Sequence, residues 1–152
     1  MSSKLEAFLG SELLPLFRDG EKLLALAPTG LSDYSFVVFP FAKVYEGFLK
    51  KLFLSIGAIN EWQYNNDRWR VGRALNPQLE KELRHESVYD RIVEHCGGVE
   101  LADRLWQAWK RGRNQIFHFW PGRNKALTLG DAKEIISQIE ATMEAALVDC
   151  KV

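Results

Sequence analysis

Residues 33–57 have the sequence DYSFVVFPFAKVYEGFLKKLFLSIG, and this stretch decides the fold class. Its large apolar side chains recur at intervals of three and four residues, at Val37, Phe41, Val44, Phe48, Leu52 and Ile56. That spacing puts them on one face of a long helix that ends near Gly57. The segment FVVFPF alone would also suit a strand, but no partner strand is evident elsewhere. The stretch predicts a helix over 33–57, with Pro40 kinking it or lying in its first turn.

Helical spacing continues on both sides of this stretch. Residues 1–27 carry apolar side chains three or four positions apart, and we expect Pro15 to bend or split that helix. Another long helix is expected over 99–118, with an end or a distortion near Gly112 or in the Trp-Pro-Gly turn at 120–122.

The remaining segments complete a helical bundle. A last helix is expected over 129–148, because Thr128 and Asp131 have the spacing of a capping box. Residues 60–76 are polar and irregular, which predicts a long ordered loop, and two short helices are expected within 77–95. The sum is an all-α bundle of four main helices plus short helices.

The composition is that of one folded domain over residues 1–152. The hydrophobic fraction is 47%, with nine Phe, five Trp and four Tyr, which suffices for a core and excludes a disordered chain. Lys and Arg number 20, as do Asp and Glu, so the net charge is zero. The field of the whole molecule is therefore not that of a general nucleic-acid binder, and any basic surface depends on an uneven distribution.

The sequence also lacks the features typical of disulfide-rich secreted proteins and of membrane proteins. Cys96 and Cys150 are too few for a disulfide framework and do not demand an oxidising compartment. Charges at Lys4, Glu6 and Glu12 interrupt any signal-peptide pattern, and no apolar run is long enough to span a bilayer. We expect a cytoplasmic protein without a membrane partner.

The common signatures of metal and cofactor sites are missing from the sequence. There is no Cys-x-x-Cys pair, and His85, His95 and His118 lack ligand partners at helical spacing. Gly97-Gly98 has neither the Lys nor the Ser/Thr of a phosphate-binding loop. The sequence predicts no metal ion and no cofactor.

One stretch concentrates positive charge in this neutral chain. Residues 104–125 contain no acidic side chain and six basic ones, at Arg104, Lys110, Arg111, Arg113, Arg123 and Lys125. Arginine forks match phosphate geometry, which favours a phosphate-binding surface. Cations also favour helix C-termini, so a solvated helix end is an equal alternative.

Helical geometry makes Arg113 unusual within this stretch. At about 100° per residue it projects within about 20° of Ala102 and Trp106, on the apolar face, where an unpaired arginine is costly. His118 has apolar neighbours and is also expected to point inward. On a straight helix the two residues diverge by about 140°. Their convergence needs a distortion at Gly112, a helix end near Phe117, or a partner subunit.

The segment Arg113-Asn114-x-x-x-His118 resembles the R-N-x-x-x-H form of the HEPN signature. The context adds to the resemblance, because RNQIFHFWPG leads into a last amphipathic helix, TLGDAKEIISQIEATMEAAL, and AKVYEGFLKKLF resembles the family's second long helix. The resemblance covers about residues 33–148. It implies a HEPN-like up-and-down bundle, and the most similar type is the ribonuclease domain of HEPN toxins such as the RNase LS toxin group.

The resemblance implies metal-independent RNA cleavage that leaves a 2′,3′-cyclic phosphate. Arg113 would hold the scissile phosphate, His118 would act as general base or acid, and Asn114 would orient the phosphate or the imidazole. HEPN sites form across a two-fold axis, which implies a homodimer with a composite active site. The implied partners are RNA, a second copy and, for a toxin, an antitoxin protein.

For the remaining candidate site residues, a functional and a structural interpretation both stay open. Some HEPN toxins use a Glu from the second long helix, and Glu46 matches by position, although a helical ion pair with Lys50 or Lys43 is the favoured interpretation. The basic side chains outside the motif would guide the RNA backbone or merely solubilise the surface. They are Lys110, Arg111, Arg123 and Lys125.

Aromatic and arginine side chains are interleaved in the irregular stretch 60–76. They are Trp62, Tyr64, Trp69, Arg68, Arg70 and Arg73. Such aromatics can stack nucleobases, but pinning the loop to the core is the favoured interpretation.

Three hypotheses follow from the sequence. The first is a HEPN ribonuclease acting as a toxin or defence effector. The second is a non-catalytic HEPN-like module that binds RNA, a nucleotide or a protein partner. The third is a helical interaction protein in which Arg113 pairs with a carboxylate inside one subunit, away from any cleft.

Overall fold

The computed structural model describes residues 1–119, 121–122 and 126–152. Within these ranges the regular elements are all helical, which confirms the all-α class. In chain order they are α1 (Ser3–Ala25), α2 (Ser35–Ser55), α3 (Glu61–Asn65), α4 (Val71–Ala74), the 3₁₀ helix η1 (Lys81–Glu86), α5 (Val88–His95), α6 (Gly98–Trp109), the π-helix η2 (Lys110–Asn114), α7 (Gln115–Phe117) and α8 (Leu129–Asp149). None of the described helices is long and apolar enough to cross a membrane.

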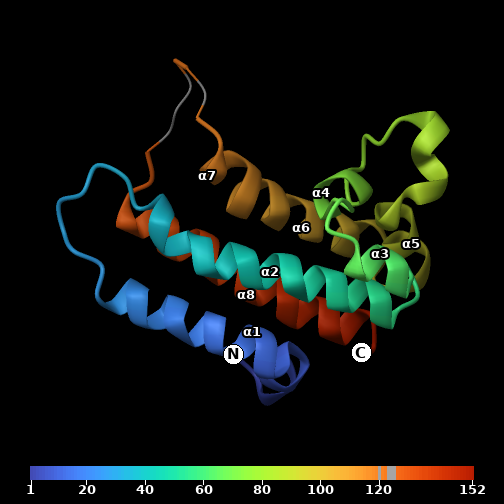
Figure 1. Cartoon of the computed structure of the whole chain (residues 1–152), viewed down its shortest axis with the longest axis horizontal. Coiled ribbons are helices and arrows are strands. Elements are labelled where there is room, and N and C mark those ends of the chain that lie inside the picture. Colours follow the sequence, from blue (N-terminus) through green and yellow to red (C-terminus); the bar gives the residue numbers. More distant parts are fainter. Residues whose placement is uncertain (120, 123–125) are drawn as a thin grey trace.

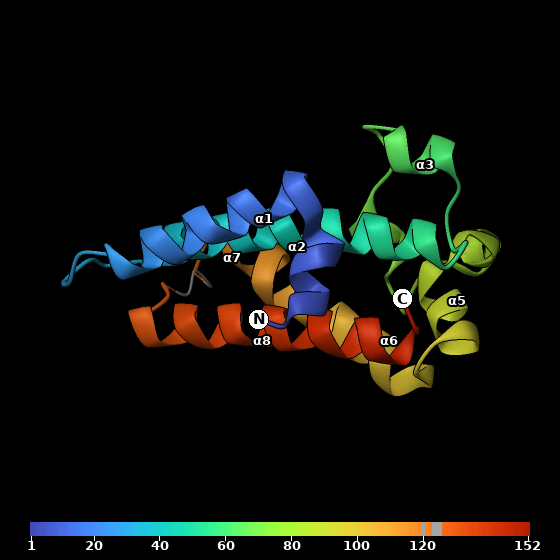
Figure 2. The ribbon, with the colours of Figure 1, turned by 90° about the horizontal axis from the view of Figure 1, so that it is seen from below.

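The long helices form two layers around the core (Figures 1 and 2). α1 packs on α2, while α8 packs on both α2 and α6. Figure 2 shows α1 and α2 in one layer and α8 with α6 in the other. Side chains with no exposed surface fill the space between them, among them Leu9, Phe48, Leu52, Leu105 and Met143. Burying each large apolar side chain contributes about 1.5–3 kcal/mol, so this core is the main source of stability.

The first helix breaks at a different residue from the one expected. Its backbone leaves helical geometry at Gly10, where φ is 64° and ψ is −166°. Pro15 lies within the helical segment that follows. The break therefore belongs to the glycine, since a left-handed backbone costs glycine little.

Asp33 fixes the start of α2 and ties it to a distant segment. Its Oδ1 accepts hydrogen bonds from the Ser35 N–H and hydroxyl, at 3.0 and 2.8 Å, and from the Leu127 N–H at 3.0 Å. Partial desolvation of the exposed Asp33 carboxyl raises its pKa, but these hydrogen bonds outweigh that effect and hold the pKa below its ordinary value. Pro40 lies in the second turn of α2 and is itself buried.

The stretch 60–76 is not a continuous loop, because it contains α3 and α4. A capping box starts α3: the Gln63 N–H donates to Asn60 Oδ1, and the Asn60 N–H donates to Gln63 Oε1, both at 2.9 Å. Asn60-x-x-Gln63 was the signal in the sequence that could have revealed this helix. The stretch 77–95 contains two short helices, η1 and α5.

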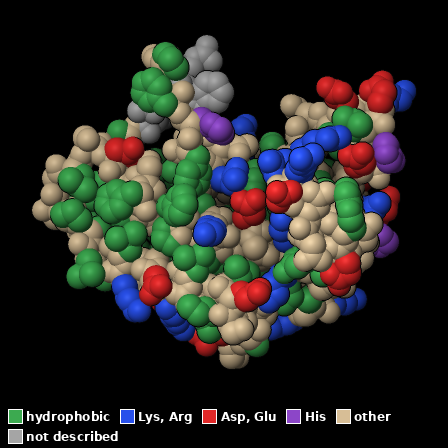
Figure 3. Space-filling view, in the orientation of Figure 1, with side chains coloured by type: hydrophobic (Ala, Val, Ile, Leu, Met, Phe, Trp, Pro, Cys, Tyr) green, Lys and Arg blue, Asp and Glu red, His purple; other side chains and the backbone are tan. Residues whose placement is uncertain are grey.

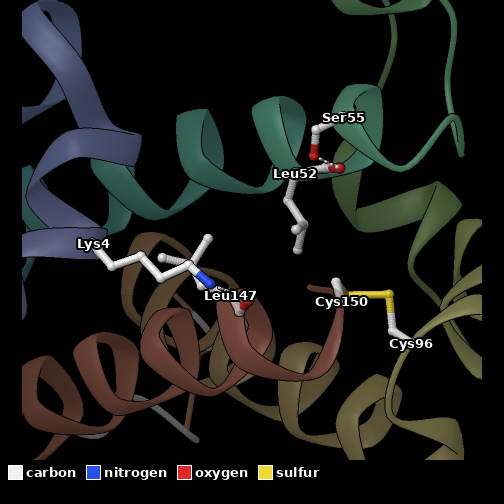
Figure 4. The surroundings of a disulfide bond; sticks show 6 residues. All are labelled: Lys4, Leu52, Ser55, Cys96, Leu147 and Cys150. Carbon is white, nitrogen blue, oxygen red and sulfur yellow. Dashed lines mark hydrogen bonds between the residues drawn. A yellow bond between two sulfur atoms is a disulfide. The ribbon is translucent and has the colours of Figure 1, made fainter. Parts of the chain in front are cut away.

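The two cysteines form a disulfide, which the composition argument did not anticipate. Cys96 caps α5 and Cys150 caps α8, so the bond joins the C-terminal ends of two helices that are 54 residues apart (Figure 4). In the same view, Lys4 donates from Nζ to the Leu147 carbonyl at 3.1 Å and so holds α1 against α8.

Candidate functional site

The helix expected over 99–118 changes its winding before the motif. α6 ends at Trp109, a π-helical turn covers Lys110–Asn114, and α7 continues to Phe117. Gly112 allows this turn to approach α8, because a Cβ there would lie 2.8 Å from Cδ1 of Ile139. A π turn closes with i→i+5 hydrogen bonds and so rotates the residues after it. The expected distortion near Gly112 is therefore present.

The distortion places Arg113 and His118 on one cavity of about 380 Å³, hereafter the Arg113 cavity. Its lining comes from α2 and from the end of the motif helix: Phe39, Ala42, Lys43, Glu46, Arg113, Phe117 and His118. Three of the four candidate catalytic side chains thus come together within one chain. A partner subunit is not needed to make Arg113 and His118 converge.

Arg113 is held from two directions. Its Nε donates to Glu46 Oε2 at 3.1 Å in an ion pair, and its guanidinium lies 4.9 Å from the centroid of the Trp109 ring. The Arg113 side chain is 41% exposed, so it lines the cavity rather than lying inside the core. For the described residues, no hydrogen bond uses its Nη1 or Nη2, which leaves both groups to an anion from solution.

Glu46 pairs across the bundle instead of along its own helix. Within the described chain its ion pair is with Arg113, so the favoured interpretation, a pair with Lys50 or Lys43, is wrong. The preceding residue anchors this part of α2, because the buried Tyr45 hydroxyl donates to the Leu105 carbonyl at 2.9 Å. Burial raises the pKa of Tyr45 well above its usual value, which keeps that hydroxyl a donor.

His118 follows α7 in an extended conformation, with φ −114° and ψ 129°. It was expected to point inward, but its side chain is exposed at the edge of the Arg113 cavity. The helix end before it turns the chain outward, and its apolar neighbour Phe119 is exposed as well. An imidazole at the rim is accessible to a substrate from solution.

The other candidate residues do not line this cavity. Asn114 and Lys110 are absent from the lining, and Arg111 points to α8, where it pairs with Glu134 at 2.8 Å and donates to Gln138 at 3.1 Å. Arg123 and Lys125 lie outside the described residues.

A larger cavity of about 510 Å³ lies on the α3–α4 segment, hereafter the Trp62 cavity. It is lined by Trp62, Gln63, Asn66, Arg68, Trp69, Arg70, Arg73, Ala74, Leu79 and Glu86. Tyr64 and Trp69 pack against the core, as the sequence favoured, but Trp62 is 70% exposed. The alternation of tryptophan and arginine in this segment is visible in the sequence, but pinning to the core was the favoured interpretation, and for Trp62 it is wrong.

Two findings concern the candidate site, one on metal ligands and one on known relatives. Among the residues that the structure describes, no three His, Cys, Asp or Glu side chains are grouped as a metal site would require. Comparisons with protein-family models, with curated proteins and with solved structures returned no match for this chain.

Proposed function

We propose that this protein is a metal-independent endoribonuclease of the HEPN type, with its reacting centre in the Arg113 cavity. One observation carries the proposal: Arg113 and His118, the two ends of the motif, line one cavity with Glu46. The proposal includes a role as a toxin or defence effector. That role rests only on the resemblance of the sequence to HEPN toxins.

Arg113 binds the scissile phosphate in this proposal. Its Nε is occupied by Glu46, so Nη1 and Nη2 form the fork that faces a phosphate. The Trp109 ring on one side and Glu46 on the other hold the guanidinium in place before substrate arrives. Such preorganised donors stabilise charge that develops in a transition state, because they need no reorientation during the reaction.

His118 moves the proton. The RNA 2′-hydroxyl attacks the adjacent phosphorus, the 2′-O–P bond forms, and the P–O5′ bond breaks, which gives a 2′,3′-cyclic phosphate and a 5′-hydroxyl. The imidazole takes the proton from the 2′-hydroxyl, or its protonated form gives one to the departing 5′-oxygen, and solvent water carries the other proton. Glu46 acts through Arg113 as a positioning residue. Asn114, which does not line the cavity, has no contact with the reacting atoms in this scheme.

A homodimer is part of the proposal, and exposed phenylalanines support it. Phe36, Phe39, Phe117 and Phe119 are all exposed, and the Phe39 and Phe117 rings meet at 5.4 Å on the cavity itself. Apolar side chains gathered beside a site are typical of an interface. A second copy seated there would enclose the cavity and exclude water. Light scattering of wild type beside Phe119→Asp tests this assembly, and a monomeric wild type contradicts it.

A non-catalytic binding module is the second candidate. The Arg113–Glu46 ion pair favours it, because a carboxylate partner within one subunit also satisfies an arginine that has only a structural role. The position of the pair on an open cavity distinguishes this arrangement from the third hypothesis, which required a pair away from any cleft.

Cleavage of RNA in EDTA tests the proposal. Wild type should cut single-stranded RNA, and His118→Ala and Arg113→Ala should each lower the rate by about 10²–10⁴-fold. His95→Ala is the matched control, since His95 is an exposed histidine on α5 that does not line the Arg113 cavity.

The outcomes separate the candidates. RNA binding without cleavage by wild type supports the binding module. Cleavage that disappears in EDTA and returns with magnesium contradicts the metal-independent mechanism. Equal loss in His118→Ala and His95→Ala contradicts the role of His118.

A further inference from the structure

The Trp62 cavity combines side chains that suit one kind of ligand. Trp62 is a largely exposed indole, and the Arg68 guanidinium has no hydrogen bond or ion pair within the described structure. Aromatic faces stack nucleobases, and arginine binds phosphates. The cavity volume of about 510 Å³ lies in the range of small-ligand sites.

The polar lining of this cavity is only partly satisfied by the protein. Gln63 and Asn66 use their side-chain oxygens to accept backbone N–H groups at 2.9 and 2.8 Å, which leaves their amide NH₂ groups without protein acceptors in the described chain. Arg70 donates to the Asp67 carbonyl, and Arg73 pairs with Glu86 at 2.9 Å. The available groups are therefore donors, which suits phosphate oxygens and base-edge acceptors.

Trp109 is the first structural connection between the two cavities. The guanidinium of Arg113 stacks on the Trp109 ring, and the same indole lies against α4, where a Cβ on Gly72 would be 2.5 Å from Nε1. Gly72 lies next to Arg73, which lines the Trp62 cavity. The motif arginine and α4 thus both pack against one buried ring.

One face of α2 is the second structural connection between the two cavities. Lys43 and Glu46 line the Arg113 cavity, and Lys50, one turn beyond Glu46, donates to the Tyr64 carbonyl in α3 at 3.4 Å. At 1.5 Å per residue, Lys43 and Lys50 are about 10.5 Å apart along the helix, which is about three nucleotide rises of 3.4 Å. Figure 3 shows several Lys and Arg side chains on this face between the end of α7 and the α3–α4 segment, with Asp and Glu side chains among them.

We propose that the Trp62 cavity is a second contact site for single-stranded RNA, in which Trp62 stacks a base and Arg68 binds a phosphate of the strand that enters the Arg113 cavity. This inference rests on the RNA substrate of the proposed function and does not require cleavage. A single strand fits better than a duplex, because base stacking on Trp62 needs an unpaired base face.

Binding of a 2′-O-methyl RNA tests the inference, since this oligonucleotide lacks the attacking hydroxyl and stays intact. An oligonucleotide of about eight residues lies within the usual range of single-strand site sizes. Fluorescence anisotropy over a range of salt concentrations should show that Trp62→Ala raises Kd by about 5- to 150-fold. Arg68→Gln should lower the slope of log K against log salt by about 0.7.

Matched controls are available outside the linings of both cavities. Leu26→Ala removes a side chain that is 80% exposed, and Arg18→Gln removes an exposed arginine of α1. Both variants should keep the wild-type Kd and slope. Trp62→Ala and Arg68→Gln should fold normally, because neither side chain is buried.

The result separates this inference from the proposed nuclease. Unchanged Kd and slope in both variants overturn it, even if cleavage depends on His118. Weaker binding by both variants supports it, even if His118→Ala cleaves like wild type and the nuclease proposal fails. Adenosine monophosphate binding as tightly as the oligonucleotide, or an acidic peptide displacing it equally well, also overturns a strand-binding site.

Discussion

The two cavities share arginine and aromatic side chains but differ in how these are held. In the Arg113 cavity, one long helix, α2, supplies most of the lining, and an ion pair and a ring fix the guanidinium of Arg113. In the Trp62 cavity, α3 and α4 are five and four residues long, and Arg68 is exposed without a partner. The first arrangement suits a reaction that needs fixed donors, and the second suits a strand that varies in sequence.

A different kind of long-range contact holds each end of the bundle: hydrogen bonds of Asp33 at the end with the Arg113 cavity and a disulfide at the end with the Trp62 cavity. Asp33 binds Leu127 at the N-terminal end of α2, the end that contributes Phe39 to the Arg113 cavity. The Cys96–Cys150 bond joins the C-terminal ends of α5 and α8, at the other end of the bundle, where α3 and α4 also lie (Figure 1). The hydrogen bonds of Asp33 and the disulfide lie at opposite ends of the bundle and differ in strength. Each end can therefore be perturbed without the other.

The largest effect is expected from exchanging arginine for lysine in each cavity. Arg113→Lys keeps the charge but loses the fork and the stacking on Trp109, so kcat should fall by about 10²–10³-fold. Arg68→Lys still neutralises a phosphate, so kcat/KM should fall by only about threefold. Steady-state cleavage of a labelled RNA measures both values.

Arg18→Lys on α1 is the control for this pair of variants and should behave as wild type. Equal losses from Arg113→Lys and Arg68→Lys would contradict the division between a reacting cavity and a binding cavity.

The disulfide should give the largest effect on stability. It closes a loop of 54 residues, and the chain-entropy relation gives about 4 kcal/mol for a loop of that length. Reduction should therefore lower the free energy of unfolding by about 2–4 kcal/mol in urea titrations. The Cys96→Ser/Cys150→Ser variant should match the reduced protein and should not respond to reductant. A reductant effect that persists in this double variant would exclude the disulfide as its source.

Gly72→Ala should weaken both cavities, because Trp109 packs against Arg113 of one cavity and against α4 beside the other. The added Cβ would lie 2.5 Å from Nε1 and 3.0 Å from Cε2 of that indole, so α4 or the ring must shift. Unfolding should become easier by about 1–3 kcal/mol. Both RNA cleavage and binding of the 2′-O-methyl RNA should decline.

Trp109→Phe provides the matched background for that test. Nε1 of Trp109 is the one buried side-chain polar atom in the described chain without a hydrogen-bond partner, and phenylalanine removes it together with the contact to Gly72. Gly72→Ala should therefore cost less in Trp109→Phe than in wild type, as a urea double-mutant cycle would show. Equal costs in both backgrounds would place the strain elsewhere.

Long periodic helices were predictable from the sequence, and short ones were not. Apolar spacing predicted a helix over 33–57 where the structure has Ser35–Ser55, and the capping box predicted the start of Leu129–Asp149. α3 and α4 are each about one turn long, too short for a hydrophobic period to emerge. The disulfide was missed because two cysteines carry no pairing information until the fold brings their helix ends together.

The candidate site was predictable as a set of residues but not as a geometry. The motif pointed to Arg113 and His118, yet a straight helix separates them by about 140°. Their convergence depends on the π turn, which depends in turn on the tertiary approach of Gly112 to Ile139. The Glu46–Arg113 pair likewise joins side chains 67 positions apart, which no local spacing specifies.

The smallest effect is expected at Asp33, which holds the Arg113 end of the bundle. Asp33→Asn weakens three hydrogen bonds to one carboxylate oxygen. Hydrogen bonds to charged groups contribute about 1.5–3 kcal/mol, but Asp33 is exposed and solvent screens the interaction, so we expect about 1 kcal/mol or less. Urea titrations at pH 7 measure this difference.

The pH dependence identifies the cause. Because the pKa of Asp33 in the folded state is below its value in the unfolded chain, its carboxylate stabilises the fold above the unfolded pKa of about 3.9. That contribution is lost as pH falls through the folded pKa, so the stability difference between wild type and Asp33→Asn should shrink below about pH 4. The Trp62 cavity is at the other end of the bundle, so binding of the 2′-O-methyl RNA there should show no matching change in the variant. A stability difference that stays constant from pH 7 to pH 3 would mean that shape, and not the charge of Asp33, holds Leu127 in place.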